Sequence, residues 1–458
     1  MEGPSRRSGS GGPPEPNRGL GRSYAVTLAG SGGVMFFTLF TGVVSARLLA
    51  PEGRGVVGAI AAWVMIASYL GGLGLREGMS WIEARNERLA PQVLTASLVS
   101  TVILAIGTVL VAVLLVPLGF GAQSSTAVTY AQVAMLWIVP YMLYNSFGSV
   151  FGARQRFAAV TAMRVGQPLL YAVGLGLVWW AGRAAVPEVL VLQAASYVIP
   201  ALLAFIVLVR SSGLGRFELP LLREGSAFGI RAFGSSLGHL ANSRLDLLIL
   251  PAILAAAEIG LYVVAISAAS MIVGLFGSLS LVVFPAAARA GGQAAVALAQ
   301  RAMRLVLVGS VVLALMLWLA APWLVTGLYG GEFAGAVTPL RLLLPGVCFW
   351  ATASIVGSSL KAIGRPSAAS GCQFAGVLVT VIGLALLLRP YGIVGAAITS
   401  SLSYTTVFVV GLFLFSRATD TSMRSVFDLR SVVRDGHWIL LRLRAILPQR
   451  QRSSSGHE

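Results

Sequence analysis

Charged residues are scarce in this chain, where Asp, Glu, Lys and Arg make up 11% of the 458 residues and hydrophobic residues make up 57%. Soluble domains usually carry about a quarter of charged residues. A mean hydropathy of +0.84 is equally unusual for a water-soluble protein of this length. The shortage of charge therefore excludes a soluble globular domain as the body of the protein and indicates an integral membrane protein.

Residues that carry catalytic or metal chemistry are few as well. The chain has three His and two Cys, and both Cys348 and Cys372 fall in apolar runs, where we expect them to pack as small apolar residues. HExxH, GxSxG, Walker and CxxC patterns are all missing from the sequence. We therefore expect no enzyme, no metal site, no cofactor and no ATPase domain on this chain, while proton or sodium coupling stays open.

Long apolar runs are what the chain has instead. A membrane-spanning helix needs about 20 mostly apolar residues. Runs of this kind predict an all-α polytopic membrane protein with twelve spans, near residues 25–48, 56–75, 93–116, 128–151, 160–181, 187–209, 228–250, 259–284, 303–326, 338–360, 368–388 and 392–416.

Positive charge is concentrated in every second loop and in the two tails. The formal net charge is +17, yet the alternate loops hold only Arg47, Arg54, Arg183 and Arg389. A nucleic-acid-binding patch would be contiguous, so this distribution argues against nucleic acid as a partner. It fits the positive-inside rule, with an even number of crossings and both termini in the cytoplasm.

The two halves of the chain resemble each other weakly. Residues 50–59 parallel residues 256–265, with an offset of 205 if Gly55 is aligned with Gly260. A Ser-Tyr pair recurs at a spacing of 207 residues, at 196–197 and 403–404. Such a repeat predicts two six-helix lobes related by pseudo-two-fold symmetry, with a substrate path between them near the bilayer midplane.

The predicted organisation has five parts. A disordered basic tail at 1–22 precedes an N-lobe at 23–209, a cytoplasmic linker at 210–227, a C-lobe at 228–416 and a basic amphipathic C-terminal tail at 417–458. The C-terminal tail combines basic residues with an apolar face. It either lies along the anionic cytoplasmic leaflet, or it is solvated and only helps to set the topology of the protein in the membrane.

Several motifs at the helix junctions carry a family resemblance. They are SARLLAPEGRG at 45–55, RLD at 244–246 followed by EIGLY at 258–262, AIGRP at 362–366 and YGIVGAA at 391–397. Together they resemble the polysaccharide transporters, the lipid-linked oligosaccharide flippases of the multidrug/oligosaccharidyl-lipid/polysaccharide (MOP) exporter superfamily. The resemblance covers residues 23–416 and leaves both tails outside it.

This resemblance implies a protein of the bacterial cytoplasmic membrane that serves surface polysaccharide biosynthesis. It would move an undecaprenyl-pyrophosphate-linked glycan from the cytoplasmic to the outer leaflet by alternating access. Its partners would be the lipid-linked glycan, membrane lipids and polysaccharide polymerase or assembly proteins.

Such a substrate would require cations and hydrogen-bonding groups within the spans. A diphosphate cannot cross hydrocarbon unpaired, and the arginine fork suits phosphate. The candidate cations are Arg244, Arg341, Arg164 and Arg76. Candidate sugar contacts are Asn242, Asn145, Tyr144, Gln167, Gln373 and Tyr404. Each has a simpler interpretation as an interfacial anchor, a snorkelling base or a bond between helices.

The seventh span holds the most unusual polar residues. On a helical wheel His239, Asn242 and Asp246 fall in one arc, which predicts that this stripe faces the cavity. Arg244 lies about 160° from Asp246, so the two cannot form an i to i+4 pair. Either Arg244 bonds another helix or this helix unwinds. Asp246 with His239 is our candidate for ion coupling, and a structural Arg/Asp link is the alternative.

Other functions remain open at this stage. A cation-coupled multidrug exporter of the same superfamily predicts an apolar or acidic cavity. A peptidoglycan-precursor flippase usually resembles a fourteen-helix protein, whereas this chain has twelve apolar runs. A scaffold of glycan assembly would act through its basic tails without transporting anything.

Overall fold

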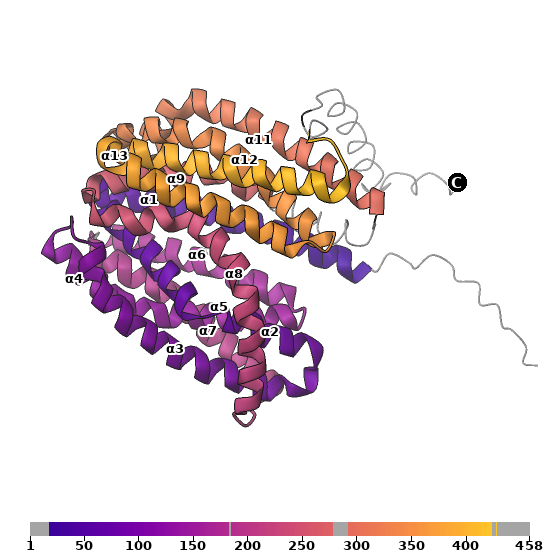
Figure 1. The fold of residues 1–458 in the computed structure, drawn as a ribbon. Coiled ribbons are helices and arrows are strands. Elements are labelled where there is room, and N and C mark those ends of the chain that lie inside the picture. Colours follow the sequence, from indigo (N-terminus) through magenta and orange to yellow (C-terminus); the bar gives the residue numbers. More distant parts are fainter. Residues whose placement is uncertain (1–17, 183–184, 278–291, 424–426, 428–458) are drawn as a thin grey trace, which may run out of the picture.

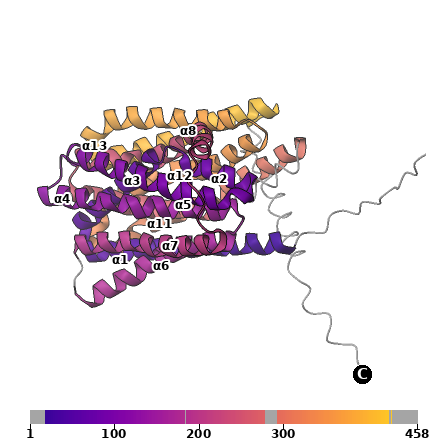
Figure 2. The same cartoon turned by 90° about the horizontal axis from the view of Figure 1, so that it is seen from below.

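The computed structural model describes residues 18–182, 185–277, 292–423 and 427. Within these residues the chain is helical, with short 3₁₀ segments and no strand. The long helices run roughly side by side along one direction (Figures 1 and 2). The predicted all-α class is therefore confirmed.

The first half of the chain contains seven helices. They are α1 (Arg18–Gly71), α2 (Leu75–Arg85), α3 (Ala90–Gly119), α4 (Ser125–Ala134), α5 (Ile138–Ala153), α6 (Phe157–Trp180) and α7 (Val186–Ser212). The second half contains α8 (Leu219–Ile249), α9 (Ala256–Gly277), α11 (Gly292–Tyr329), α12 (Val337–Ala362) and α13 (Pro366–Thr419).

Two of these helices each contain a sharp kink. In α1 the backbone of Ala50 leaves the helical region, with φ 53° and ψ 177°, and Pro51 begins the next segment. In α13 the backbone of Gly392, two residues after Pro390, also leaves the helical region, with φ 53° and ψ −132°. Proline suits the first turn of a helix because its missing N–H would have no partner there. Each long helix is therefore a pair of spans joined by a tight corner.

Twelve membrane-crossing segments follow from this geometry. Eight helical stretches of the described chain are long and apolar enough to cross a membrane, and the kinked α1 and α13 are among them. The 24-residue α6 and the 31-residue α8 add two more crossings of lower hydropathy. The predicted number of spans is confirmed.

The two ends of the bundle differ in charge. We call the end that carries the turns at 72–74, 154–156, 213–218 and 363–365 the basic end, and the end that carries the turns at 120–124, 253–255 and 330–336 the opposite end. Residues Arg76, Arg154, Arg216 and Lys361 lie at or near the basic end.

Helix α8 connects the two halves of the molecule. Its first part packs against α2 and its last part packs against α13, whereas α1 packs along α9. In Figure 1, α8 runs from beside α2 towards α13, with α3, α5 and α7 on one side of it and α11 and α12 on the other. This arrangement gives the two lobes that the sequence predicts. The proposed amphipathic helix within 417–458 falls almost entirely outside the described residues.

Candidate functional site

A cavity of about 540 Å³ lies between the two halves, and we call it the central cavity. Six helices contribute to its wall: α1, α2, α8, α9, α12 and α13. The lining residues that carry polar or aromatic groups are Tyr69, Arg76, His239, Trp350, Ser354, Ser358, Lys361 and Gln373. The sequence predicted three of them, Arg76, His239 and Gln373, as site residues.

The lining of the central cavity is cationic. Arg76 of α2 and Lys361 in the last turn of α12 approach it from opposite halves, and its described lining includes no carboxylate. Arg76 forms an ion pair of 2.6 Å with its neighbour Glu77, and both side chains are partly exposed. Partly exposed pairs of this kind are weak, so Arg76 can exchange Glu77 for an anionic ligand at little cost.

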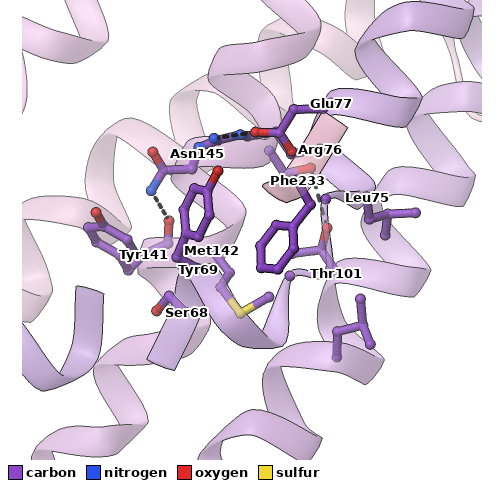
Figure 3. Close-up of a pocket in the computed structure, with 14 residues that line it drawn as sticks. Ser68, Tyr69, Leu75, Arg76, Glu77, Thr101, Tyr141, Met142, Asn145 and Phe233 are labelled. Atoms are coloured by element: carbon purple, nitrogen blue, oxygen red, sulfur yellow. Dashed lines mark hydrogen bonds and ion pairs between the residues drawn. The ribbon is translucent and has the colours of Figure 1, made fainter. Parts of the chain in front are cut away.

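A smaller pocket of about 70 Å³ adjoins the central cavity, because Tyr69 and Arg76 line both. Figure 3 shows the Tyr69 ring beside that of Phe233 from α8, with Arg76 and Glu77 at the edge of the pocket. The two ring centroids are 5.3 Å apart and the rings are stacked. Asn145 of α5 lies here too, where its Nδ2 donates to the carbonyl of Tyr141 at 2.8 Å.

Aromatic rings continue the cavity wall on the second half. The imidazole of His239 stacks on Trp350, with 4.9 Å between ring centroids. Trp350 in turn packs against Tyr404 at 4.8 Å. Tyr404 is buried behind Trp350, so the predicted sugar contact at Tyr404 would require Trp350 to move.

The first half holds a matching aromatic group. The rings of Tyr141 and Tyr144 lie edge-on to Tyr197, at centroid distances of 5.1 Å and 5.2 Å. Next to them Gln167 donates from Nε2 to the hydroxyl of Ser196 at 2.8 Å. The Tyr144–Tyr197 pair corresponds in sequence spacing to Trp350–Tyr404, which supports the predicted internal repeat.

Asn242 is placed differently from the sequence expectation. It is 3% exposed, and its Nδ2 donates to the backbone carbonyl of Gln373 at 2.7 Å and to the side-chain Oε1 of Gln373 at 3.0 Å. The hydroxyl of Ser403 donates to its Oδ1 at 3.1 Å. Asn242 therefore ties α8 to α13 and orients Gln373, instead of facing the cavity directly.

Asp246 is likewise turned into the second half. It is 2% exposed and accepts from the hydroxyl of Tyr262 at 2.6 Å, from Ser400 at 3.2 Å and from the backbone N–H of Leu247 at 2.7 Å. The stripe predicted to face the cavity does so only at His239, because α13 and α9 cover the other two residues.

Arg244 and Arg341 stand apart from the described cavities. Helix α8 is continuous through Arg244, so neither local unwinding nor a pair with Asp246 occurs. Arg244 is half-buried and does not line the central cavity. Arg341 lies over the Trp318 ring at 4.4 Å and donates to the Trp318 carbonyl at 3.1 Å, an arrangement that fits its interfacial alternative.

Arg164 lines a second cavity of about 400 Å³ between α1, α6 and α9, which we call the side cavity. Its other polar lining residues are Ser31, Thr38 and Ser270. Val273 and Gly277 of α9 line both the side cavity and the central cavity, so only α9 separates the two.

The opposite end of the bundle is sealed by contacts between the halves. Gly55 of α1 lies directly against the backbone carbonyl of Ala256, and Gly260 of α9 lies against that of Pro51. Gln123 donates from Nε2 to the carbonyls of Pro251 at 3.1 Å and Leu254 at 2.7 Å. Arg47 donates to carbonyls at the end of α11. The structure is therefore closed at the opposite end and hollow towards the basic end.

Sequence analysis missed the contribution of α12. Trp350, Ser354, Ser358 and Lys361 line the cavity from this helix, and none of them is among the predicted site residues. These residues follow one another at intervals of three or four, which is the spacing of one helical face. That polar stripe in an apolar run was the available signal. Among the described residues no cluster of His, Cys, Asp and Glu could hold a metal ion.

Comparison with protein families identifies the chain. Residues 20–290 match the model of a family described as polysaccharide biosynthesis protein. Because the match covers more than half of the 458 residues, the chain belongs to that family. The family predicted from the junction motifs is thus confirmed. A comparison with curated protein sequences gave no match.

Several solved transporter structures have a similar fold. The lipid II flippase MurJ in an inward closed conformation matches with a TM-score of 0.74 and 14% identity, over 93% of each chain. An inward-facing MATE family multidrug resistance transporter matches with a TM-score of 0.68 and 16% identity, over 87% of this chain and 99% of the other. A MOP superfamily transporter from Pyrococcus furiosus, described as having a binding pocket of reverse polarity, matches with a TM-score of 0.54 and 14% identity, over 87% and 96%.

These likenesses concern the fold. The chain is a multi-pass membrane protein of the polysaccharide biosynthesis family with the two-lobed architecture of MOP superfamily transporters. Fold alone does not assign a substrate, because the same fold serves flippases and drug exporters.

Proposed function

We propose that this protein is a flippase for an undecaprenyl-pyrophosphate-linked oligosaccharide, acting in surface polysaccharide biosynthesis. The observation that carries the proposal is the central cavity of about 540 Å³, which Arg76 and Lys361 line from opposite halves without any carboxylate in its described lining. Family membership supplies the polysaccharide context.

The chemistry of the substrate accounts for this lining. A diphosphate taken from the aqueous surface loses its hydration, and two cations of opposite lobes can replace that hydration with charge-assisted hydrogen bonds. His239 adds a third nitrogen base to the same wall. Ser354, Ser358 and Gln373 offer hydroxyl and amide partners for sugars, and Trp350 and Tyr69 offer ring surfaces.

The orientation follows from charge. We place the basic end in the cytoplasm of a bacterial cell, since its turns hold Arg154, Arg156, Arg216 and Arg365, whereas the turns at 120–124, 253–255 and 330–336 hold no Lys or Arg. Both termini are then cytoplasmic, where polysaccharide polymerase or assembly proteins are possible partners of the basic tails. The central cavity opens towards the face on which lipid-linked glycans are made.

Alternating access then requires the closed end to open. The seal at the opposite end consists of backbone contacts at Gly55 and Gly260 and a few hydrogen bonds, which rigid lobes can break together. Cationic side chains of both lobes would hold the lipid-linked glycan between them. When the lobes rock, the glycan would become exposed to the other leaflet.

Asp246 is our candidate for coupling this movement to an ion gradient. It is a buried carboxylate on α8 with Tyr262 of α9 and Ser400 of α13 as hydrogen-bond partners. A proton or sodium ion at this carboxylate would change how three helices of the second half are joined. The stacked imidazole of His239 lies on the same helix and lines the cavity, so it offers a link to the substrate site.

A drug exporter for organic cations is disfavoured by the same cavity. Such a substrate needs acidic or apolar lining, whereas Arg76 and Lys361 would repel it. A peptidoglycan-precursor flippase carries a similar diphosphate, so the distinction between the two flippase functions lies in the glycan.

Reconstituted vesicles test the proposal. Purified protein is placed in liposomes with one of three substrates: a lipid-linked oligosaccharide, lipid II or a cationic dye. We expect the first to become accessible to an impermeant glycan-modifying enzyme faster than in protein-free liposomes, and the dye to remain untransported. Dye transport without glycolipid movement would refute the proposal, and preferential movement of lipid II would assign the peptidoglycan precursor instead.

A further inference from the structure

Arg54 is a cation that the proposed transport path does not use. It lies on α1, four residues after the kink at Ala50, and it does not line the central cavity. The residue is partly buried, its Nε is fully buried, and its guanidinium forms no hydrogen bond or ion pair with another described residue. Arg47 on the same helix, in contrast, donates to two backbone carbonyls. Burying a charged group without partners is costly, so Arg54 requires a partner that the described chain does not supply.

The surroundings of Arg54 do not neutralise its charge. Pro51 begins the second segment of α1, so Arg54 stands in the first turn, where the helix dipole is itself positive. Glu52 of the same turn is exposed and lies about 160° away around the helix. Tyr171 of α6 and Tyr329 of α11 are the titratable groups of the described chain that interact electrostatically with the guanidinium. Phenols are neutral at pH 7, so one positive charge stays uncompensated.

A space lies beside the guanidinium. Gly42, on the first segment of α1, is buried. Beyond its own helical turn, the one described heavy atom within 4 Å of a side-chain carbon at Gly42 would be Nη2 of Arg54, at 3.8 Å. The hydroxyl of Tyr171, a residue that is 5% exposed, is also buried without a hydrogen-bond partner. We call this space, bounded by Gly42, Arg54 and Tyr171, the inner pocket. Its polar groups are donors that lack an acceptor.

The side cavity leads towards the inner pocket. Thr38 of α1 lines the side cavity, and Gly42 follows one helical turn further towards the opposite end. On α6, Arg164 lines the side cavity, and Tyr171 lies about 10 Å further in the same direction. The exposed guanidinium of Arg164 would attract anions to this entrance. A small anion therefore has a route to the inner pocket that does not pass through the central cavity.

The second half of the molecule contributes one wall of the inner pocket. Tyr329, the last residue of α11, is 3% exposed and interacts with the guanidinium of Arg54. Arg47 fixes this end of α11 by donating to the carbonyls of Gly327 and Leu328. These contacts belong to the seal between the lobes at the opposite end. The inner pocket is therefore enclosed only while that end is closed.

Charge and size select the class of ligand. One guanidinium balances one negative charge, whereas a diphosphate or a sulfate would bring negative charge that nothing in the pocket compensates. The pocket offers N–H and O–H donors and, among the described residues, no carboxylate that would bind a metal cation. Water would satisfy the hydrogen bonds but not the charge. The space left by the missing side chain of a glycine suits an ion of about the size of a halide.

We propose that the inner pocket binds a small monovalent anion of the size of chloride, held by Arg54 and Tyr171, and that this anion stabilises the state closed at the opposite end. A ligand that binds one conformation more tightly shifts the population towards that conformation. Opening would separate Tyr329 from Arg54, admit water and release the anion. The inner pocket is thus distinct from the diphosphate site between Arg76 and Lys361, and it adds an ion that regulates the movement of the lobes.

The dependence of stability on the anion tests the site. Thermal unfolding of the purified protein in detergent is compared in chloride, bromide and gluconate at one ionic strength. We expect chloride and bromide to raise Tm saturably, and this rise to be absent in Arg54→Gln. In gluconate Arg54→Gln should be at least as stable as the unmodified protein, because it removes an unpaired charge. Arg47→Gln is the matched control on the same helix, and it should keep the rise, as should Arg76→Gln combined with Lys361→Gln.

Two outcomes of this experiment would overturn the proposal. A rise in Tm that persists in Arg54→Gln would place the anion elsewhere. Equal Tm values in the three salts for the unmodified protein would show that Arg54 is hydrated and binds no anion.

Two further variants reach the inner pocket without removing its charge. Tyr171→Phe deletes one hydroxyl, and we expect the affinity for chloride to fall severalfold. Gly42→Val fills the space and should abolish the effect of chloride on Tm, whereas Gly32→Val, at an exposed glycine of the same helix, should preserve it. In crystals grown with bromide, we expect an anomalous scattering peak beside Nη2 of Arg54. Unchanged affinity in both pocket variants, or bromide only in the central cavity, would overturn the assignment.

Accessibility of the opposite end tests the effect on conformation. A cysteine replaces the buried Leu254, and the two native cysteines are replaced by alanine. In proteoliposomes, we expect an impermeant maleimide at the opposite end to react severalfold more slowly in chloride than in gluconate, and at equal rates in the two salts with Arg54→Gln. Arg47→Gln should react faster in both salts and keep their ratio. Equal rates for the unmodified protein would overturn the role in closure. These measurements involve no glycolipid, so the anion site and the proposed flippase function can fail separately.

Discussion

Gly55 and Gly260 lie at equivalent positions of the two halves. Each packs against the carbonyl of the residue four positions before the other glycine. Gly55 lies against the carbonyl of Ala256, and Gly260 lies against that of Pro51. Gly55 and Gly260 are 205 positions apart along the chain, as are Pro51 and Ala256, so α1 and α9 cross close to the pseudo-two-fold axis. Gly58 meets Val263, its own equivalent, a little further along the same crossing.

A large side chain at this crossing should prevent the opposite end from closing. In Gly55→Leu the new side chain would occupy the space of the Ala256 carbonyl. We expect a reporter cysteine replacing the buried Leu254, in a protein whose two native cysteines are replaced by alanine, to react faster with an impermeant maleimide applied to the opposite end. Gly148→Leu is the control, since nothing lies within 4 Å of a side chain there. Unchanged reactivity in a folded Gly55→Leu would contradict the role of this contact.

Gln123 should act as a latch on the same seal. Its amide donates to two carbonyls of the second half, so Gln123→Ala removes two hydrogen bonds between the lobes. Hydrogen bonds contribute about 1 kcal/mol each, and we expect the open population to rise by about tenfold or more. The same reporter at position 254 measures this. Gln132→Ala, whose amide bonds within the first half, should leave reactivity unchanged, and equal effects of the two variants would argue against a latch.

Much of this fold can be predicted from composition and periodicity. Apolar runs give the twelve spans, because in a membrane every backbone group must be satisfied within a helix. The proline between the first two apolar runs indicates the corner at Ala50 and Pro51. The repeat at Gly55 and Gly260 is visible before the contact that explains it.

The site is predicted less completely, because it depends on which helix faces which. A helical wheel groups Asn242 with Asp246, yet it contains no information on α13 and α9, which cover them. Arg76 reaches the central cavity as expected. Lys361 does so from α12, where the stripe from Trp350 to Lys361 is only about three turns long.

Replacing the buried carboxylate should separate coupling from folding. Asp246→Asn keeps the size of the side chain and its capacity to accept from Tyr262 and Ser400. We expect the purified variant to fold and to flip substrate at a rate that no longer responds to a proton or sodium gradient. Ser400→Ala, which retains the carboxylate, should keep the response. A gradient response that survives in Asp246→Asn would assign this residue to structure alone.

The buried ion pair at the basic end should make stability depend on pH. Glu83 is 1% exposed and contacts Arg154 at 2.5 Å. Burial raises the pKa of Glu83 above its ordinary value of 4.5, and Arg154 opposes this in part. The folded protein then keeps a proton that the unfolded chain has lost. The free energy of unfolding should therefore fall as the pH rises from 4.5 through the raised pKa. Thermal unfolding in detergent measures it, and Glu83→Gln should lack this dependence.

Removing one partner of this pair should cost more than removing both. Arg154→Met leaves the Glu83 carboxylate buried and unpaired, at a cost of about 3–5 kcal/mol. We expect the double variant with Glu83→Gln to be more stable than Arg154→Met alone. If the two substitutions are additive, the pair is not coupled and the pH dependence must come from elsewhere.

Transport by variants of the two cavity cations tests the central claim most directly, since that claim is that Arg76 and Lys361 carry the diphosphate between the lobes. Flipping of a lipid-linked oligosaccharide is measured in vesicles for Arg76→Gln, Lys361→Gln, their combination and the control Arg341→Gln, whose guanidinium lies on Trp318. Loss of one charged hydrogen bond, about 1.5–3 kcal/mol, predicts rates lowered about tenfold or more in each single variant, with the control unchanged. A folded double variant that flips substrate at the unmodified rate would contradict the account.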